Sequence, residues 1–291
     1  MSAVPEPVSV VIPVYNAAHN LALATSIWVD ALNKLGQDYE LILVNDGSTD
    51  ATGVKAEELV KKYSQVRVLT HESPKGFGAC LRTALPETRY ALFFYTALDY
   101  PYTPQDLRQL LMRIDNTDEI FNRKLDLVSG CRTGQPVPTG WKLLGYLFRG
   151  FCRIGLGLPL DPLPGWLGFK AHRRSWTSWI LFGVPLVDIN SAFKVFRKSL
   201  LEKFPIQSDG EFVHAELIAK STFVNSLMDE LPLTPRPDPI PNPRWADLWK
   251  ILSDAEFTPP AVEPPPVPPP TTRRVARFTI PRRTGAPGRP C

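Results

Sequence analysis

Residues 40–50 read ELILVNDGSTD, an apolar run that passes directly into polar turn residues. Glu40–Val44 has the aliphatic and β-branched composition of a buried strand. Either Asp50 or Thr49 can accept a hydrogen bond from the first turn of a following helix, which the pattern extends to about Tyr63. This stretch therefore predicts a strand, a short loop and a helix in close succession.

The same alternation continues on both sides of this segment. It predicts further strands at 8–14, 65–69, 90–96, 125–131 and 191–196, and further helices at 21–35, 76–85, 104–114 and 210–222. A last strand is expected to end near Pro232. Such alternation is typical of an α/β fold in which helices flank a mostly parallel sheet. In these folds, ligands bind at the carboxyl ends of the strands.

The charge of the chain is concentrated near its C-terminal end. The 291 residues are 44% hydrophobic and carry a net charge of +4. Residues 257–291 contain six Arg and one Glu, so this part carries +5 and the rest about −1. A nucleic-acid-binding protein would carry positive charge on its folded face, so the sequence predicts no nucleic-acid partner.

Proline content divides the chain into three parts. Residues 1–234 are expected to form one domain, 235–256 a proline-rich linker with a short amphipathic helix, and 257–291 a disordered Pro/Arg-rich tail. The N-terminus lacks a basic start followed by an apolar run, so we expect a cytoplasmic protein that is not secreted. The four cysteines form no close pair, which argues against a zinc or C-x-x-C redox site.

Three polar residues follow predicted strands, at the positions where a ligand would bind. The G-x-G-x-x-G motif of dinucleotide-binding folds does not follow the first predicted strand. The three polar residues are Asn16, Asp46 and Asp99. Asp46 can accept hydrogen bonds from a base or a ribose, and Asp99 can hold a divalent cation that bridges two phosphates. The alternatives are a simple turn residue for Asp46 and a helix cap for Asp99.

Six motifs follow one another between about residues 8 and 236. They are VSVVIPVYNAAHNL (8–21), YELILVNDGSTDAT (39–52), KGFGACLRTAL (75–85), FFYTALDYPYTPQDL (93–107), VDINSAFKVFRKSLLEKF (187–204) and SDGEFVHAELIAKS (208–221). This ordered set resembles the family 2 glycosyltransferases of the GT-A (Rossmann-like) fold. The last two motifs resemble the polyprenyl-phosphate sugar transferases of that family, such as dolichol-phosphate mannose synthase.

The resemblance implies a nucleotide-diphospho-sugar donor, a divalent cation (Mg²⁺ or Mn²⁺) and inversion at the anomeric carbon. The positions that match the family's donor-binding residues are Pro13, Tyr15, Asn16, Asp46, Gly76, Arg82 and Asp99. Asp99 is also the matching metal ligand. Asp188 matches the acid of the D-x-x-x-G-F-R signature, and Asp209 and Glu211 match an acidic pair before the next helix; Asp188 and Asp209 are the catalytic candidates. The alternatives are a structural cap or ion-pair partner for Asp188 and a helix start for Asp209.

One departure from the family pattern concerns the metal. The first acid of the D-x-D motif is Ala97 here, although residues two apart in an extended segment face the same way. Asp99 would therefore hold the cation with help from the oxygens of the donor diphosphate. A decayed D-x-D motif in a non-catalytic nucleotide-sugar-binding protein is the alternative.

The acceptor determines which other residues are needed. A lipid phosphate is already ionised and needs cations to position it. The candidates for binding it are Arg132, Arg149, Arg153 and Lys194, although a solvated helix face also explains Arg149 and Arg153. Trp- and Arg-bearing segments between Trp141 and Leu181 could place the protein peripherally on the cytoplasmic membrane face. The alternative is a soluble transferase acting on a glycan hydroxyl, which would need a carboxylate base.

Overall fold

The computed structural model describes residues 6–99, 102–118, 121–132, 191–234 and 257–260. All of them belong to one compact unit, Met1–Ala261. The predicted segments at Trp141–Leu181 and Trp245–Leu252 lie outside the described residues.

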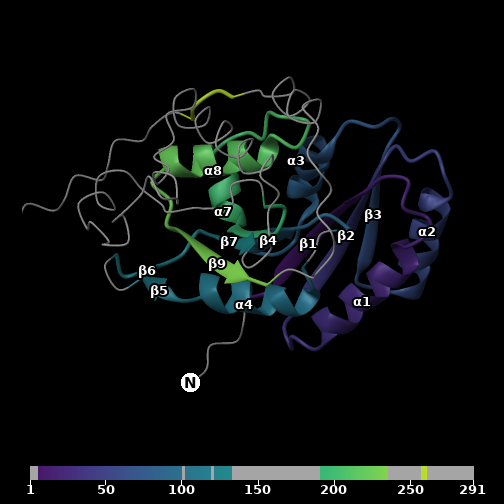
Figure 1. Cartoon of the computed structure of the whole chain (residues 1–291), viewed down its shortest axis with the longest axis horizontal. Coiled ribbons are helices and arrows are strands. Elements are labelled where there is room, and N and C mark those ends of the chain that lie inside the picture. Colours follow the sequence, from purple (N-terminus) through teal and green to yellow (C-terminus); the bar gives the residue numbers. More distant parts are fainter. Residues whose placement is uncertain (1–5, 100–101, 119–120, 133–190, 235–256, 261–291) are drawn as a thin grey trace, which may run out of the picture. The chain divides into compact units, whose positions relative to one another are not determined.

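A seven-stranded sheet forms the centre of the fold (Figure 1). Its order is β3-β2-β1-β4-β8-β7-β9, and β8 runs antiparallel to both of its neighbours while the other pairs are parallel. The strands are β1 (Val8–Val14), β2 (Tyr39–Asp46), β3 (Val66–His71), β4 (Leu92–Tyr95), β7 (Leu127–Arg132), β8 (Lys194–Arg197) and β9 (Met228–Leu233). The carboxyl ends of the six parallel-running strands therefore share one edge.

Helices cover both faces of this sheet (Figure 1). One core cluster joins the sheet to α1 (Leu21–Asn33), α2 (Thr52–Lys62) and α4 (Pro104–Ile114). The second cluster joins the other face to α3 (Phe77–Glu87), α7 (Lys198–Leu201) and α8 (Val213–Phe223). The period-2 alternation of strands explains the division, because successive side chains point to opposite faces and both faces are covered.

Strand β1 illustrates this arrangement. Val10 and Ile12 belong to the first cluster, whereas Val11 belongs to the second, and all three are fully buried. A strand buried on both faces reads as a continuous apolar run, which is how residues 8–14 read in the sequence.

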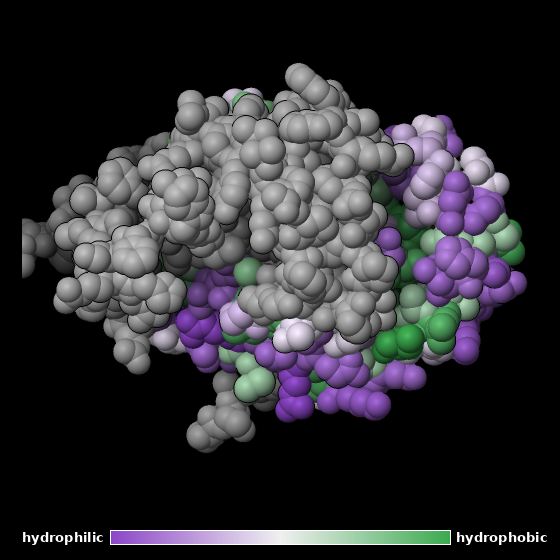
Figure 2. Space-filling view, viewed as in Figure 1, coloured by the Kyte–Doolittle hydropathy of each residue, from purple (hydrophilic) through white to green (hydrophobic). Residues whose placement is uncertain are grey.

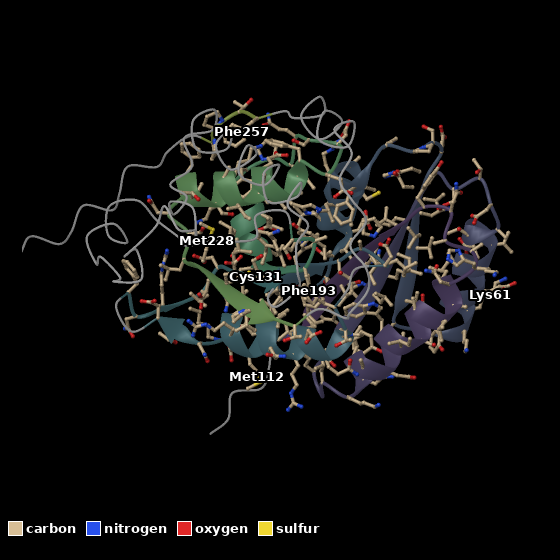
Figure 3. The ribbon with its side chains drawn as sticks, viewed as in Figure 1. Lys61, Met112, Cys131, Phe193, Met228 and Phe257 are labelled. Carbon is tan, nitrogen blue, oxygen red and sulfur yellow. The ribbon has the colours of Figure 1, made fainter. Side chains whose placement is uncertain are left out.

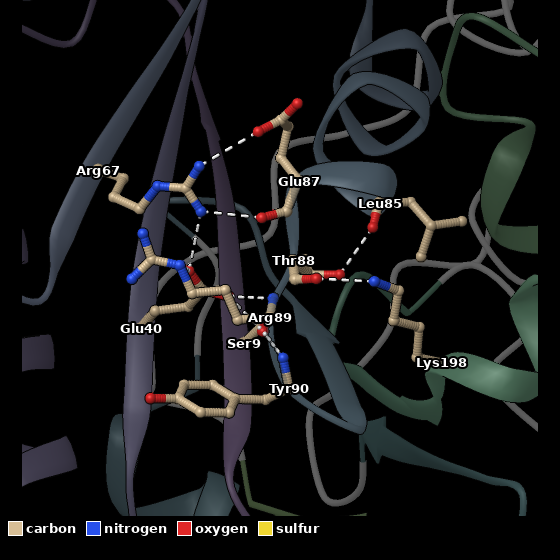
Figure 4. A network of polar contacts seen from close by, with 9 residues as sticks. All are labelled: Ser9, Glu40, Arg67, Leu85, Glu87, Thr88, Arg89, Tyr90 and Lys198. Atoms are coloured by element: carbon tan, nitrogen blue, oxygen red, sulfur yellow. Dashed lines mark hydrogen bonds and ion pairs between the residues drawn. The ribbon is translucent and has the colours of Figure 1, made fainter.

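A polar network closes the end of the sheet opposite the carboxyl edge (Figure 4). The buried Glu40 carboxylate accepts hydrogen bonds from Ser9 Oγ at 2.7 Å, from the Arg89 backbone N–H at 2.6 Å and from Arg67 at 3.0 Å. These contacts join β1, β2, β3 and the chain entering β4. We assign this buried charge to fixing the strands in place, because its partners satisfy both carboxylate oxygens.

The α/β fold and the mostly parallel sheet are confirmed. The predicted helix at 104–114 matches α4 in its bounds, and a capping box at Thr103 and Asp106 begins that helix. The predicted helix at 210–222 begins later, at Val213, and the predicted strand at 191–196 begins at Lys194. The sequence did not predict α7 or the hairpin of β5 (Thr117–Asp118) and β6 (Arg123–Lys124).

Two further details bear on the predictions. Ala51 is the N-cap residue of α2, so neither Thr49 nor Asp50 occupies that position, although the Asp50 carboxylate accepts the Thr52 backbone N–H of the first turn at 2.9 Å. Phe257, the first residue of the predicted tail (labelled in Figure 3), packs against Phe223 of α8. The domain bounds and the disorder of the tail stay predictions.

Hydrophobic and hydrophilic side chains are mixed on the visible surface (Figure 2). Several large apolar side chains are exposed on the helices, including Leu23 and Ile27 of α1 and Val54 of α2. Within the described part of the chain, no helix combines the length and the apolar character that crossing a membrane requires.

Candidate active site

A pocket of about 400 Å³ opens at the carboxyl edge of the sheet. Three of the predicted donor-binding residues line it at the end of β1 and in the loop that follows, namely Pro13, Tyr15 and Asn16. Asp46 at the end of β2 and Asp99 beyond β4 line it as well. The fold thus brings together five of the predicted donor-binding residues, as expected for a site at the strand ends.

Asn16 ties the first two loops of this edge together. Its φ of 48° lies in the left-handed region, which asparagine tolerates better than most residues. Its side-chain Oδ1 accepts the Thr49 backbone N–H at 2.9 Å, and its own N–H donates to Ser48 Oγ at 3.0 Å. Asn16 therefore shapes the pocket wall, while the neighbouring Tyr15 side chain is exposed at the opening.

Asp46 anchors the turn that precedes α3. Its carboxylate accepts the backbone N–H groups of Lys75 at 2.9 Å and Gly76 at 2.8 Å, and His71 Nδ1 donates to it at 2.7 Å. Burial raises the pKa of Asp46, but the hydrogen bonds from His71 and the two backbone groups outweigh it, so the pKa lies below its usual value. Asp46 is therefore an ionised, structurally engaged acid.

A fourth contact nearly exhausts the accepting capacity of Asp46. The Cys80 thiol is hydrogen-bonded to the same carboxylate, and burial together with this neighbour raises the pKa of the thiol. A carboxylate has about four lone-pair sites. A base or ribose that binds Asp46 would therefore compete with a donor that is already present.

Asp46, His71 and Cys80 also form a cluster that could hold a metal ion. One ligand atom from each lies within 4.8 Å of the others, and all three residues are buried. His71 Nε2 lies 2.9 Å from Thr83 Oγ1, so the imidazole is held at both nitrogens. Sequence reasoning did not find this cluster, because its members come from three separate elements, β2, β3 and α3.

Gly76 and Arg82 lie against the segment that connects α7 to α8. Gly76 has a φ of 103°, and a Cβ on it would lie 2.5 Å from the Asp209 carbonyl oxygen, so this approach requires glycine. Arg82 forms an ion pair with the Asp209 carboxylate, whose side chain is 59% exposed. Arg82 and Asp209 are not among the residues that line the pocket. The catalytic role of Asp209 and the donor-binding role of Arg82 stay predictions.

Glu211 is the member of the acidic pair that reaches the pocket. His214 Nε2 donates to its carboxylate at 3.0 Å, and the Tyr95 hydroxyl donates to His214 Nδ1 at 3.1 Å. The His214 side chain is buried, while that of Glu211 is 58% exposed. The sequence could not indicate which acid faces the pocket, because both lie in an irregular connection without a fixed side-chain period.

Asp99 and Ala97 both line the pocket, and Asp99 is exposed. The two more accessible carboxylates of the pocket, Asp99 and Glu211, suit Mg²⁺ or Mn²⁺, because such cations take one or two carboxylates and complete their shell with substrate oxygens and water. The chemistry of these side chains therefore fits a divalent cation that binds together with a diphosphate.

The predicted acceptor-binding cations are separated by the fold. Lys194 lies fully buried in β8, and its ammonium donates to the Ser191 carbonyl. Arg132 ends β7, so its backbone lies at the same sheet edge as the pocket. Arg149 and Arg153, as well as the catalytic candidate Asp188, lie outside the described residues.

Residues 9–172 match the family model for glycosyl transferase family 2. Relatives include an undecaprenyl-phosphate mannosyltransferase of Micrococcus luteus, which is 29% identical over 71% of this chain and 84% of the relative. A dolichol-phosphate mannosyltransferase of Pyrococcus furiosus is 34% identical over 39% of this chain. A dodecaprenyl-phosphate galacturonate synthase of Rhizobium johnstonii is 24% identical over 69% of this chain. The matched part spans 31% of the Pyrococcus protein and 51% of the Rhizobium protein.

Solved structures share the fold at lower identity. Glucosyl-3-phosphoglycerate synthase from Mycobacterium tuberculosis, solved with Mn²⁺, UDP and phosphoglyceric acid, aligns with a TM-score of 0.57 and 19% identity, covering 84% of this chain and 74% of that one. Mannosyl-3-phosphoglycerate synthase from Rubrobacter xylanophilus gives 0.54 and 17%, covering 84% and 70%.

Proposed function

The chain belongs to glycosyl transferase family 2, and from this premise we propose that it transfers a sugar from a nucleotide-diphospho-sugar to a polyprenyl phosphate. The observation that carries the proposal is the pocket at the carboxyl edge, where Asp99 and Glu211 present two carboxylates beside the loop that Asn16 fixes. This is the place where open α/β sheets bind their ligands.

The proposed reaction is a single displacement. An acceptor oxygen forms a bond to the anomeric carbon while the bond from that carbon to the diphosphate oxygen breaks, and the electron pair leaves with the nucleotide diphosphate. This exchange inverts the anomeric configuration. A divalent cation bound with Asp99 would neutralise the charge that develops on the leaving diphosphate. Asn16 and Asp46 contribute by holding the loops that form the pocket wall.

The relatives support a polyprenyl phosphate as the acceptor, because the names of three of them contain dolichol, dodecaprenyl or undecaprenyl phosphate. An ionised phosphate needs positioning cations rather than a base. We propose Arg132, Arg149 and Arg153 for this role, and with it a peripheral position on the cytoplasmic membrane face. Lys194 is the weakest of the four candidates, since its ammonium is buried against a carbonyl.

A transfer assay tests the reaction. Purified protein is incubated with nucleotide sugars, Mn²⁺ and a polyprenyl phosphate in detergent, and the glycolipid product is quantified. Asp99→Asn is expected to lower kcat by about 100-fold, because it removes the protein's charge from the cation that stabilises the leaving group. Asp38→Asn, which alters an exposed acid outside the pocket, is the control and should transfer like the wild type. Equal rates for the Asp99→Asn and Asp38→Asn variants would contradict the proposal.

Two specific observations favour other functions. Ala97 in the pocket wall favours a non-catalytic nucleotide-sugar-binding protein, which would bind the donor without turnover. The Glu211–His214 pair favours a transferase acting on a glycan hydroxyl, because such an acceptor needs a carboxylate base. In that case Glu211→Gln would abolish transfer to a glycan, and the polyprenyl phosphate would not be glycosylated.

A further inference from the structure

Residues 205–211, here called the 205–211 connection, form most of the segment between α7 and α8, and hydrogen bonds from other parts of the domain hold most of them in place. Two buried residues of α8 hold its first half. The Glu216 carboxylate accepts the backbone N–H groups of Gln207 at 2.7 Å and Ser208 at 2.8 Å, and the Lys220 ammonium donates to the Pro205 carbonyl at 2.7 Å. Neither Glu216 nor Lys220 is exposed to solvent.

Helix α3 holds the same connection from the other side. Arg82 donates to the Gln207 carbonyl at 2.9 Å, and the Asp209 carbonyl accepts the N–H groups of Gly78 at 2.7 Å and Ala79 at 3.1 Å. The last of these contacts is made by Asp209, two residues before Glu211, the acid that lines the pocket. The position of Glu211 therefore depends on how the 205–211 connection is held.

A third set of contacts comes from residues far along the chain. The Thr258 backbone N–H donates to Gln207 Oε1 at 2.8 Å, and Gln207 Nε2 donates to Thr258 Oγ1 at 3.1 Å. The Phe257 ring lies 6.1 Å from the Phe223 ring and 6.0 Å from the Lys220 ammonium (Figure 3). Lys220 also donates to Gln207 Oε1 at 2.7 Å, so Gln207 links the buried ion pair to Thr258.

We propose that Phe257 and Thr258 form a clamp on the 205–211 connection, and that through it the C-terminal part of the chain positions Glu211 in the pocket. The clamp itself needs only the contacts described above; its consequence for turnover rests on the proposed function. The physical reason is that a pocket side chain must be held to within a fraction of an ångström, which depends on the contacts that support it. Thr258 is thus a positioning residue rather than a catalytic one.

Hydrogen exchange on the full-length chain tests the clamp. Thr258→Val removes the hydroxyl that accepts from Gln207, and Gln207→Met removes, at similar volume, both hydrogen bonds to Thr258 and the one from Lys220. We expect the Gln207 and Ser208 amides to exchange about tenfold faster in both variants, since a lost hydrogen bond of ordinary strength weakens local protection by that factor. The double variant should exchange no faster than Gln207→Met, because Gln207→Met already removes both hydrogen bonds between the two residues.

Matched control variants show whether faster exchange comes from loss of the clamp or from substituting any threonine or phenylalanine. Thr258→Ser keeps the hydroxyl and should behave like the wild type, whereas Thr117→Val changes an exposed threonine of the remote β5–β6 hairpin. Phe257→Ala should speed exchange of the same two amides, and Phe121→Ala, at an exposed ring between β5 and β6, should not. Unchanged exchange at Gln207 and Ser208 in Thr258→Val and Phe257→Ala would overturn the clamp.

Kinetics test the positioning role. Thr258→Val is expected to lower kcat about tenfold with the donor KM within about twofold of the wild type, because Asp46 and Asp99 are untouched. Faster exchange with an unchanged kcat would overturn the positioning role. If the wild type transfers no sugar to any acceptor, the proposed function fails, and the exchange measurement alone decides whether the clamp exists.

Discussion

At the scale of single residues, Asp46 shows how one side chain can organise a site without being its most accessible group. It joins the end of β2 to the turn before α3 through two backbone N–H groups and His71. Gly47, the next residue, has a φ of 63°, and a Cβ on it would lie 2.3 Å from the Ser73 backbone. The close approach of these two loops therefore needs both the acid and the glycine that follows it.

Replacing Asp46 by Asn should destabilise the protein in a pH-dependent way. The folded-state pKa of Asp46 is lowered, so its contribution is present above the unfolded value of about 3.8 and is lost as the pH falls through the folded pKa. We expect Asp46→Asn to lower the free energy of unfolding by about 1–3 kcal/mol at pH 7, because one buried N–H group loses its acceptor. The difference from the wild type should shrink below about pH 4.

Denaturant titrations at pH 7 and between about pH 3 and 4 measure this difference. Asp38→Asn serves as the control for an exposed acid. Equal stability of wild type and Asp46→Asn at pH 7 would show that the carboxylate does not hold the turn before α3.

At the scale of elements, α8 is unusual because it is buried on all sides from Val213 to Ser221. It nevertheless carries Glu216 and Lys220, whose charged groups lie 2.6 Å apart with no exposed side-chain surface. A buried pair of this kind is tolerated only when its remaining donors and acceptors are satisfied. The 205–211 connection supplies these partners, so helix and connection must form together.

Removing the cation of this pair should be costly. In Lys220→Met the Glu216 carboxylate stays buried without its countercharge, and the free energy of unfolding should fall by about 3–5 kcal/mol. The double variant Glu216→Gln/Lys220→Met should recover part of this loss, because it removes the uncompensated charge. Lys61→Met, at an exposed lysine of α2 (Figure 3), is the matched control. A loss no larger than that of the control, measured by denaturant titration, would contradict this account of α8.

At the scale of the whole molecule, the two ends of the sheet have different chemistry. The end built on Glu40 is closed by Arg67 and Ser9 (Figure 4), whereas the carboxyl edge carries a pocket with accessible carboxylates. The parallel direction of β1, β2 and β4 produces this difference, because it brings every loop that follows a strand to one edge.

The sequence predicted most of this arrangement where the signal is local. The apolar runs at 8–14, 40–44 and 90–96 predicted β1, β2 and β4, and in the structure the residues that follow these runs, Asn16, Asp46 and Asp99, line one pocket. What it could not predict depends on contacts between distant segments. Glu211 rather than Asp209 lines the pocket, which follows from the hydrogen bonds between α3 and the Asp209 carbonyl. The cluster of Asp46, His71 and Cys80 forms only when three elements pack together. No periodicity within one segment encodes such contacts.

The proposed donor site depends on a divalent cation and on the carboxylate of Asp99. Calorimetric titration of the purified protein with UDP, GDP and their sugar conjugates, with and without Mn²⁺ or Mg²⁺, tests this claim most directly. We predict binding that requires the cation and that Asp99→Ala weakens by at least about tenfold, or 1.4 kcal/mol. Binding that is equally tight without the cation and indifferent to Asp99→Ala would contradict the claim and favour a metal-free nucleotide-sugar-binding protein.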